Sequence, residues 1–366
     1  MAERGAPPRV PAGRRRVLAL VRSFTSPLLP DDYLELVNPL WSTRELRGRI
    51  ERVERETPSA VTVLIKPGWE WEHHRPGQYV RLGIEVDGVH HWRAYSLTSE
   101  PGRSDGCISI TPKLVEGGKV SPFLFGRVRP GTIVRLGGVE GTFVLPEPLP
   151  GRILFISAGS GITPIMSMLR SIAARRTIED VTHVHCARSA EEVIFARELR
   201  ELHARHRGYR LHLRLTGEQG RVTPDQLDEL CEDWREREAF VCGPTGLLEG
   251  MEQHWREAGD PGRLHVEHFQ PGTAVGDGER GRGGEIRFCR SGVKATSDGE
   301  QPILVAGEAA GARLPYGCRM GICHTCVGRL RTGRVRDLRT GLVHGQPGEM
   351  LRTCINAPEG AVEIDL

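Results

Sequence analysis

Four cysteines near the end of the chain are spaced so that their thiolates could share two iron ions. Cys318, Cys323 and Cys326 follow a C-x4-C-x2-C pattern, and 27 residues separate Cys326 from Cys354. This spacing is typical of a [2Fe–2S] cluster. A structural zinc site is the alternative, but zinc favours two close pairs of cysteines rather than a trio and one distant partner. The pattern therefore predicts an iron–sulfur cluster.

Residues 285–366, which contain these cysteines, resemble the plant-type ferredoxins. The resemblance implies an α+β domain with the β-grasp fold. It also implies four cluster ligands, which are Cys318, Cys323, Cys326 and Cys354. Gly317 and Gly321 can adopt positive φ at no steric cost, which lets the loop wrap around a cluster. Such a cluster transfers one electron at a time, so the rest of the chain must supply the electrons.

The composition indicates a globular protein of two or three domains. The chain has 366 residues, of which 38% are hydrophobic and 27% charged, and its net charge of +3 indicates no nucleic-acid partner. The other five cysteines are too scattered for a disulfide framework, and cluster thiolates favour a reducing compartment. No apolar run approaches the length of a membrane span, and residues 17–21 are too short for a signal peptide. We expect a cytoplasmic monomer.

The hydrophobic pattern divides the rest of the chain. Residues 1–43 form an N-terminal extension, in which residues 1–16 should be disordered and residues 26–42 should be a flap or a docking segment. Residues 44–148 show period-two segments at 60–65, 78–82 and 132–136, separated by Pro-Gly and Asp-Gly turns. Many short strands of this kind predict an antiparallel β-barrel.

Residues 149–270 alternate between strands and helices. Strands are expected at 152–157, 182–186, 209–215, 239–242 and 265–269, and helices at 190–205, 224–237 and 245–258. This alternation predicts an α/β domain with a parallel sheet covered by helices on both faces. Residues 271–284 contain six glycines in fourteen positions, which predicts a flexible linker to the iron–sulfur domain.

Two stretches of the barrel region contain candidates for binding a diphosphate. Arg93-Ala94-Tyr95-Ser96 follows a strand, and taken alone it could be an ordinary strand end with a stacked tyrosine. The second stretch, residues 117–124, reads as a glycine turn that opens a short helix. Ser121 can cap this helix and Pro122 suits its first position. A helix N-terminus offers free N–H groups to a diphosphate.

Together with the turns of the α/β region, these stretches make residues 44–270 resemble the ferredoxin–NADP reductase superfamily. The resemblance implies that Arg93 binds the flavin diphosphate, that Tyr95 stacks beside the flavin ring and that Ser96 hydrogen-bonds near flavin N5. It further implies that the phosphates are held by Gly118, Lys119, Val120 and Ser121. The flavin is expected to be FAD rather than FMN.

The α/β region carries two turns expected to face the nicotinamide. Gly159-Ser160-Gly161-Ile162-Thr163-Pro164 departs from the dinucleotide fingerprint because proline replaces its third glycine, yet its backbone N–H groups can still meet a pyrophosphate. The resemblance places Thr163 and Cys242 close to the nicotinamide ring. Gly243 follows Cys242 in the second turn. We therefore expect Gly159, Gly161 and Gly243 to bind the cofactor, and Ser96, Thr163 and Cys242 to act in hydride transfer.

Arg188 and Ser189 follow the second strand of the α/β region, where NAD enzymes place a carboxylate for the ribose 2′-hydroxyl. A guanidinium and a hydroxyl suit a 2′-phosphate, so NADPH is favoured, with NADH as the alternative. Glu191 and Glu192 come next and would oppose a phosphate if they turned inward. Phe269, after the last strand, is the candidate aromatic residue against the flavin.

These features predict a reductase that passes electrons from NADPH to FAD, to the [2Fe–2S] cluster and then to an oxygenase. Residues 27–49 resemble reductases of the actinobacterial type that serve membrane acyl-CoA desaturases, which makes a membrane diiron desaturase the first expected acceptor. The alternatives are an aromatic-ring, alkane or haem monooxygenase, or a redox-sensing role without turnover. Arginines at 329, 331, 334, 336 and 339 suggest peripheral contact with the inner face of the membrane.

Overall fold

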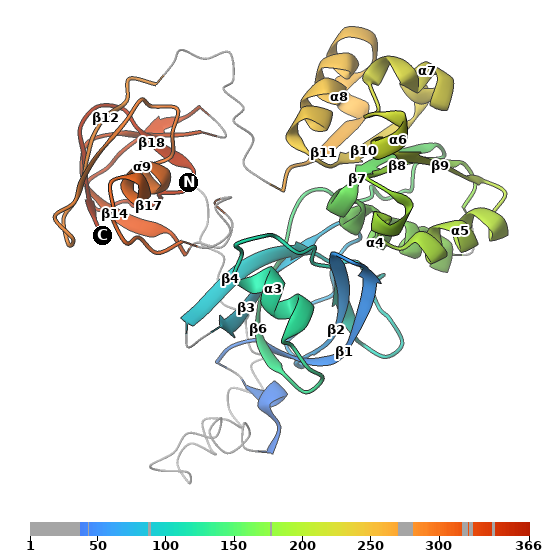
Figure 1. Cartoon of the computed structure of the whole chain (residues 1–366), viewed down its shortest axis with the longest axis horizontal. Helices are drawn as coiled ribbons and strands as arrows, with labels where there is room; N and C mark the ends of the chain where they lie inside the picture. The colour runs from blue at the N-terminus through green and yellow to red at the C-terminus, as the bar shows by residue number, and fades with distance from the viewer. Residues whose placement is uncertain are drawn as a thin grey trace.

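The computed structural model of this chain describes residues 37–42, 44–86, 89–175, 178–269, 281–316, 321, 325–338 and 341–366. Figure 1 shows three separate units along the chain: a closed sheet at the start, a helix-covered sheet in the middle and a smaller unit at the end. The predicted multidomain class is thereby confirmed. Cys318, Cys323, Gly317 and most of the expected linker lie outside the described residues, as does nearly all of the N-terminal extension.

The first unit is an antiparallel sheet in the order β4-β3-β6-β1-β2-β5. Its strands are β1 (Arg47–Thr57), β2 (Ala60–Pro67), β3 (Tyr79–Val86), β4 (Val89–Ser96), β5 (Ile108–Ile110) and β6 (Ile133–Glu140). A bridge between Leu97 and Ile110 joins the two edges, so that the sheet closes into a barrel. Every second residue of β2, such as Val61, Val63 and Ile65, is buried in its core. The short helices η1 (Pro39–Trp41) and α3 (Val120–Gly126) lie outside the sheet.

The second unit is a parallel sheet in the order β11-β10-β7-β8-β9. Its strands are β7 (Ile153–Ala158), β8 (Val181–Ala187), β9 (Tyr209–Leu215), β10 (Glu238–Cys242) and β11 (Leu264–Glu267). The helices are α4 (Ile162–Ala174), α5 (Ala196–Arg205), α6 (Thr216–Gln219), α7 (Leu227–Leu230) and α8 (Thr245–Ala258). Phe155 and Phe240 pack against α4 and α5, whereas Leu154 and Val241 pack against α7 and α8. Helices therefore cover both faces, as predicted.

Two of the helices predicted for this unit are broken. The stretch 190–205 is split into η3 (Ala190–Glu192) and α5, because Phe195 adopts a left-handed φ of 60° and the buried residues 193–195 anchor the chain between them. The stretch 224–237 consists of η4 (Pro224–Gln226), α7 and η5 (Trp234–Glu236). Trp234 is fully buried, and its indole N–H donates to Asp228, which turns the chain too sharply for one helix. The prediction of 245–258 is confirmed by α8.

Helix α4 fixes the second unit to the barrel. Arg170 donates to the backbone carbonyl of Thr98 at 2.7 Å, and the Ser167 hydroxyl donates to the carbonyl of Ser99 at 2.8 Å. The same Ser99 carbonyl oxygen lies 3.1 Å from Nε2 of the buried His74. These contacts tie the helix to the segment that follows β4.

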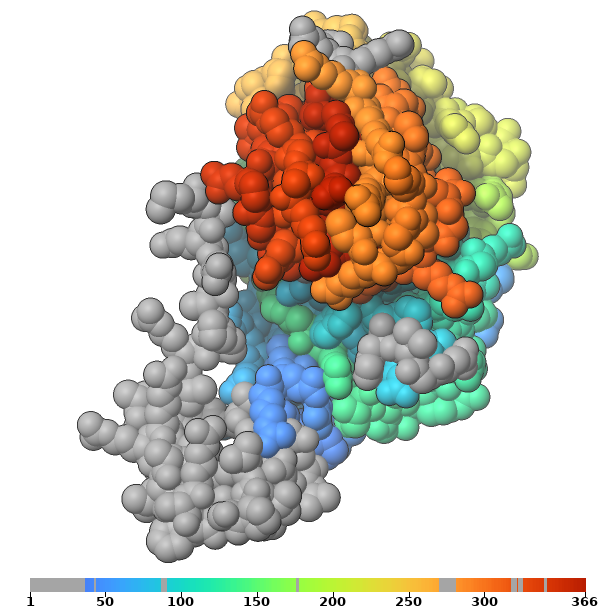
Figure 2. Space-filling view, turned by 90° about the vertical axis from the view of Figure 1, so that its left-hand side faces the viewer, coloured from blue at the N-terminus to red at the C-terminus, as the bar shows by residue number. Residues whose placement is uncertain are grey.

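The third unit has a mixed five-stranded sheet in the order β13-β12-β19-β14-β17 and a small sheet in the order β16-β15-β18. Its strands are β12 (Gly284–Phe288), β13 (Lys294–Ser297), β14 (Val327–Thr332), β15 (Val335–Asp337), β16 (Val343–His344), β17 (Met350–Arg352), β18 (Asn356–Pro358) and β19 (Val362–Asp365). Helix α9 (Ile303–Ala309) packs on the larger sheet, where Gly307 faces the Phe288 ring with no room for a larger residue. Figure 2 views the molecule with this unit, coloured orange to red, facing the reader.

Among the described residues, none of the helices combines the length and apolar character that crossing a bilayer requires.

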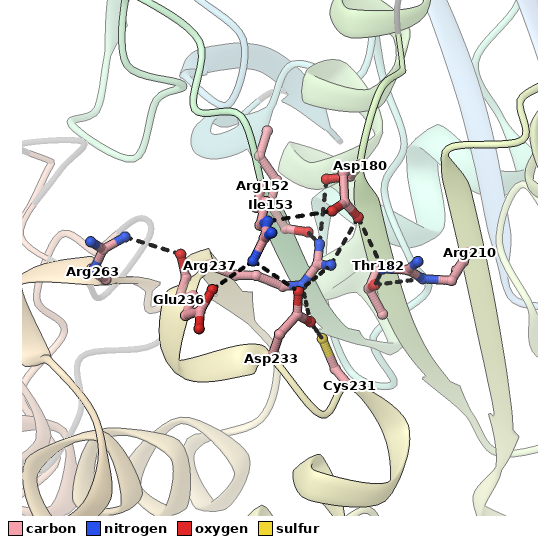
Figure 3. A network of polar contacts seen from close by, with 10 residues as sticks. All are labelled: Arg152, Ile153, Asp180, Thr182, Arg210, Cys231, Asp233, Glu236, Arg237 and Arg263. Carbon is pink, nitrogen blue, oxygen red and sulfur yellow. Dashed lines mark hydrogen bonds and ion pairs between the residues drawn. The ribbon is translucent and has the colours of Figure 1, made fainter.

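A buried arginine holds together the amino ends of the parallel strands (Figure 3). The Arg237 side chain is 0% exposed and donates to the carboxylates of Asp233, at 2.6 and 2.8 Å, and Asp180, at 2.8 Å. A further bond reaches the carbonyl of Ile153 at 3.2 Å. The guanidinium thus joins the start of β7, the residue before β8 and the start of β10.

Replacing Arg237 should destabilise the second unit. Arg237→Leu leaves two carboxylates without their main partner, so we expect a loss of about 3 kcal/mol. This is the lower end of the range for a broken buried pair, because Asp180 and Asp233 are 31% and 33% exposed. Urea unfolding followed by tryptophan fluorescence measures it. Arg210→Leu removes an exposed pair with the same Asp180 and should cost less than about 1 kcal/mol. Equal losses in the two variants would contradict the role given to Arg237.

Candidate functional site

A cleft of about 260 Å³ lies where the barrel meets the carboxyl ends of the parallel strands. The barrel contributes Tyr79, Tyr95 and Ser96 together with the segment from Thr111 to Val115. The parallel-sheet unit contributes Ser160, Thr163, Glu267, His268 and Phe269. The structure therefore brings together the predicted residues Tyr95, Ser96, Thr163 and Phe269, which come from three separate parts of the chain.

The floor of the cleft depends on the turn between β7 and α4. Gly159 has a φ of +54°, and Gly161 lies so close to the peptide of Cys242 and Gly243 that a side chain would overlap the Cys242 carbonyl. The two predicted turns are thus in direct contact. Thr163 follows on the first turn of α4, and its hydroxyl donates to the carbonyl of Ser160 at 2.9 Å.

Beneath this turn, polar side chains fill the sheet face. The Ser157 hydroxyl lies 2.8 Å from Nε2 of His183 and 2.8 Å from Nδ1 of His185. His183 in turn lies 2.8 Å from the Tyr209 hydroxyl. Burial lowers the pKa of His183 well below its usual value and lowers the pKa of His185 to about 4. Both rings are therefore neutral at physiological pH, and the network stiffens the strand that carries the turn.

Glu267 is a titratable residue of the cleft that the sequence reasoning missed. It is paired in register with Cys242, and burial raises the pKa of its carboxyl to about 7. A carboxylate at the carboxyl end of the last strand, where the cleft forms, was the signal that could have identified it. Cys242 itself is fully buried and does not line the cleft, and burial, followed by the charge of Glu267, raises the pKa of its thiol well above its usual value. The Cys242 thiol is therefore protonated and packs under the cleft.

The predicted diphosphate site differs from its expected geometry. Helix α3 begins at Val120 with Lys119 as its N-cap, and Ser121 makes no cap hydrogen bond. Instead, the Ser121 hydroxyl accepts from the backbone N–H of Val115 at 3.1 Å and closes the loop that precedes the helix. Gly118 approaches the Val115 carbonyl too closely for a side chain. The capping role predicted for Ser121 is therefore wrong, because the glycine turn folds back on Val115.

Arg93 lies on β4, two residues before Tyr95, but it is not among the residues that line the cleft. Its guanidinium donates to the carbonyl of Trp92 at 2.7 Å. Tyr95 packs against the barrel core, and burial raises the pKa of its hydroxyl. The neighbouring Tyr79, which sequence reasoning also missed, donates from its hydroxyl to Glu140 at 3.1 Å.

The predicted 2′-phosphate site lies in the loop after β8. Arg188 is exposed and Ser189 half-buried, and the Arg188 carbonyl accepts from the backbone N–H of Gly217 at 3.0 Å. Glu191 is exposed, whereas Glu192 turns toward the barrel and accepts hydrogen bonds from Ser59 and Lys113. The Glu192 carboxylate could have repelled a phosphate, but it is hydrogen-bonded to the other domain instead.

Two of the four predicted cluster ligands lie in the described part of the third unit. Cys326 and Cys354 are buried, at 1% and 3% exposed. The Cys354 sulfur accepts from the backbone N–H of Gly321 at 3.2 Å, and Gly321 has a φ of +72°. A backbone N–H directed at a cysteine sulfur stabilises an anionic thiolate, which is the form of cysteine that binds a metal. These residues fit an iron–sulfur cluster.

Comparison with protein families gives three matches along the chain. Residues 70–145 match the oxidoreductase FAD-binding domain, residues 155–253 the oxidoreductase NAD-binding domain and residues 286–359 the 2Fe-2S iron-sulfur cluster binding domain. An NADPH oxidoreductase of Mycobacterium tuberculosis is 48% identical over 94% of this chain and 90% of its own length. The chain belongs to the ferredoxin–NADP reductase superfamily, with a C-terminal [2Fe–2S] domain.

Reductase subunits of oxygenase systems are among the proteins similar to this chain. The glycine betaine monooxygenase reductase subunit of Pseudomonas aeruginosa is 30% identical over 80% of this chain and 87% of its own length. Among solved structures, phthalate dioxygenase reductase covers 87% of this chain and 97% of its own, with a TM-score of 0.58 and 20% identity. This last likeness concerns the fold alone.

The reductase is an NAD(P)H-dependent oxidoreductase with FAD and a [2Fe–2S] cluster as its cofactors. The cleft fits a flavin ring, since aromatic side chains (Tyr79, Tyr95, Phe269) and hydroxyls (Ser96, Thr163) line it together. The fold class is confirmed for all three domains. The roles of the individual site residues stay predictions.

The pKa of Glu267 predicts how stability depends on pH. Because the folded-state value of about 7 exceeds the unfolded value of 4.5, folding favours the protonated carboxyl. The stability that folding gains with Glu267 protonated is fully present below pH 4.5. It is lost as the pH rises to about 7 and beyond, because the buried carboxyl then ionises. Glu267→Gln should therefore be more stable than the natural protein at pH 8, by up to about 3 kcal/mol, and equally stable at pH 4.5.

The measurement is thermal unfolding of the purified flavoprotein from pH 4.5 to 8.5. The control Glu249→Gln changes an exposed carboxylate of α8 and should follow the natural protein at every pH. A constant difference between Glu267→Gln and the natural protein across this range would disprove the raised pKa.

Proposed function

We propose that this chain is the NADPH-oxidising reductase component of an oxygenase system, which delivers electrons singly through its own [2Fe–2S] domain. The observation that carries the proposal is the cleft shared by the flavin domain and the nicotinamide domain, in a chain that also contains the cluster-binding domain. FAD supplies the chemistry of accepting a hydride equivalent and releasing single electrons. A redox sensor does not turn over NADPH, so it would not require a cleft in which the nicotinamide meets the flavin.

In this proposal each side of the cleft holds one reactant. Tyr95 and Ser96 orient the flavin from the barrel side, while Thr163 and the N–H groups of the Gly159–Gly161 turn position the nicotinamide nucleotide. Glu267 is placed where it can hold or release a proton near neutral pH. Cys242 stays beneath this contact as a protonated thiol and shapes the floor.

The relatives favour a general oxygenase acceptor over the desaturase expected from the N-terminal resemblance. Glycine betaine monooxygenase is the system named for a relative that is 30% identical to this chain, and that relative is not described as serving a desaturase. Residues 27–36 and 43, about half of the stretch that carried the desaturase resemblance, lie outside the described residues. We therefore infer an oxygenase partner and retain the desaturase as a narrower candidate within that group.

The charge argument for a membrane or acidic partner is weaker than the sequence suggested. Arg336 is mostly buried and pairs with Glu359 at 2.6 Å, and Arg331 pairs with Asp365 at 3.2 Å. Arg339 lies outside the described residues, so Arg329 and Arg334 are the exposed arginines of this group for which the structure shows no carboxylate partner. Two charges give a modest attraction that salt screens over about 10 Å.

A variant without the cluster tests the order of electron transfer. Cys354→Ser should abolish the cluster absorbance and the reduction of cytochrome c, because Cys354 is a predicted cluster ligand. NADPH-dependent reduction of ferricyanide should persist, since a flavin can reduce ferricyanide directly. Cys289→Ser, at a half-buried cysteine of the same domain, is the control and should keep both activities. Loss of ferricyanide reduction in Cys354→Ser would contradict the modular pathway.

A second variant tests the choice of nucleotide. Arg188→Ala should raise the KM for NADPH on the order of tenfold or more and leave that for NADH almost unchanged, because a charge-assisted hydrogen bond contributes about 1.5–3 kcal/mol. Arg197→Ala, at a fully exposed arginine of α5, should change neither value. Steady-state kinetics with both nucleotides measures the effect. Equal use of NADPH and NADH by the natural protein would refute the preference.

A further inference from the structure

One carboxylate links the nicotinamide domain to the wall of the flavin cleft. Glu192 Oε2 accepts from the Ser59 hydroxyl at 2.6 Å and from the Lys113 ammonium at 2.8 Å. Both donors belong to the barrel, whereas Glu192 belongs to η3 of the other domain. The Lys113 and Glu192 side chains are 34% and 22% exposed, so this ion pair is partly shielded from water.

The barrel half of this link is rigid. The backbone N–H of Leu114 donates to the Ser59 carbonyl at 2.7 Å, and Lys113 forms a β-bridge with Ala60. The two donors are therefore held side by side before they meet the carboxylate. Lys113 also lies in the segment that lines the cleft. The position of Glu192 is thus fixed relative to the flavin site.

The other half of the link is the loop predicted to recognise the 2′-phosphate. Glu192 comes four residues after Arg188, whose carbonyl is fixed by Gly217. Hydrogen bonds from Lys113 and Ser59 lower the pKa of Glu192, and the charge of Arg188 adds to this effect. Glu192 is therefore ionised at neutral pH and lies within electrostatic range of Arg188.

An ionised carboxylate in this loop has two arrangements with opposite consequences. Released from the barrel, it would pair with the Arg188 guanidinium and repel a 2′-phosphate. Bound to Lys113, it has its charge compensated and its Oε2 directed at the barrel. We propose that Lys113, a residue of the flavin domain, sets the nucleotide preference of the nicotinamide domain by holding the Glu192 carboxylate away from Arg188. This inference rests on the proposed recognition of NADPH through Arg188.

The first test is binding of 2′,5′-ADP, which carries the 2′-phosphate but no nicotinamide, measured by calorimetry beside 5′-ADP. Lys113→Met should weaken the binding of 2′,5′-ADP about tenfold, since the expected loss is that of one charge-assisted contact to the 2′-phosphate. The binding of 5′-ADP should change much less. The ratio of kcat/KM for NADPH and NADH should fall by a similar factor.

The second variant separates this role from a merely structural one. Adding Glu192→Gln to Lys113→Met should restore the preference, because a neutral amide cannot compete with the phosphate for Arg188. Ser59→Ala removes one of the two donors and should shift the ratio in the same direction as Lys113→Met, but less. The flavin absorbance of each variant confirms that the domain is folded and loaded.

Each failure points to one cause. If Lys113→Met weakens both ADP ligands equally, Lys113 acts on the part of the nucleotide common to both, and the inference is overturned. The inference is likewise overturned if the double variant does not recover the preference. If Arg188→Ala leaves the preference for NADPH over NADH unchanged, the proposed recognition of NADPH itself fails. If Arg188→Ala lowers this preference and Lys113→Met does not, only the inference about Lys113 fails.

Discussion

The functional cleft depends on a backbone contact that only glycine permits. Gly161 lies against the peptide that joins Cys242 to Gly243, where any side chain would overlap the Cys242 carbonyl. Because β7 and β10 are adjacent parallel strands, this contact joins the turns at their carboxyl ends into one floor. Thr163 stands directly after that floor on α4, opposite the barrel residue Ser96. A larger residue at position 161 would separate the strand ends and displace Thr163.

The floor is polar but carries little charge. Glu267, Cys242, Ser157 and His185 form one row across β11, β10, β7 and β8. Burial keeps the Cys242 thiol protonated and the His185 ring neutral, and it brings the pKa of Glu267 to about 7. Charges at the rim, on the loop after β8 and on Lys113, therefore dominate the field that an incoming anionic nucleotide meets.

The sequence allowed prediction of those parts that follow a repeating pattern. Strand β9 and helix α8 have the predicted bounds, because each has a regular apolar face. Prediction failed where one tertiary contact overrides local preference. Phe195 adopts a left-handed conformation to bury its ring, and Ser121 binds the N–H of Val115 in place of a helix end. Such contacts depend on partners that periodicity does not identify.

The sequence identified most of the cleft residues but could not provide the geometry that aligns them across two domains. Arg170 and Ser167 donate to the carbonyls of Thr98 and Ser99, which lie only two and three residues beyond Ser96. Thr163 lies on the same helix, one turn before Ser167 and two turns before Arg170. The hydroxyl of Ser96, on the flavin side, is therefore connected to the hydroxyl of Thr163, on the nicotinamide side, through a few residues that hydrogen-bond across the domain boundary. Because that path is so short, small rearrangements elsewhere in either domain change the distance between Ser96 and Thr163 very little.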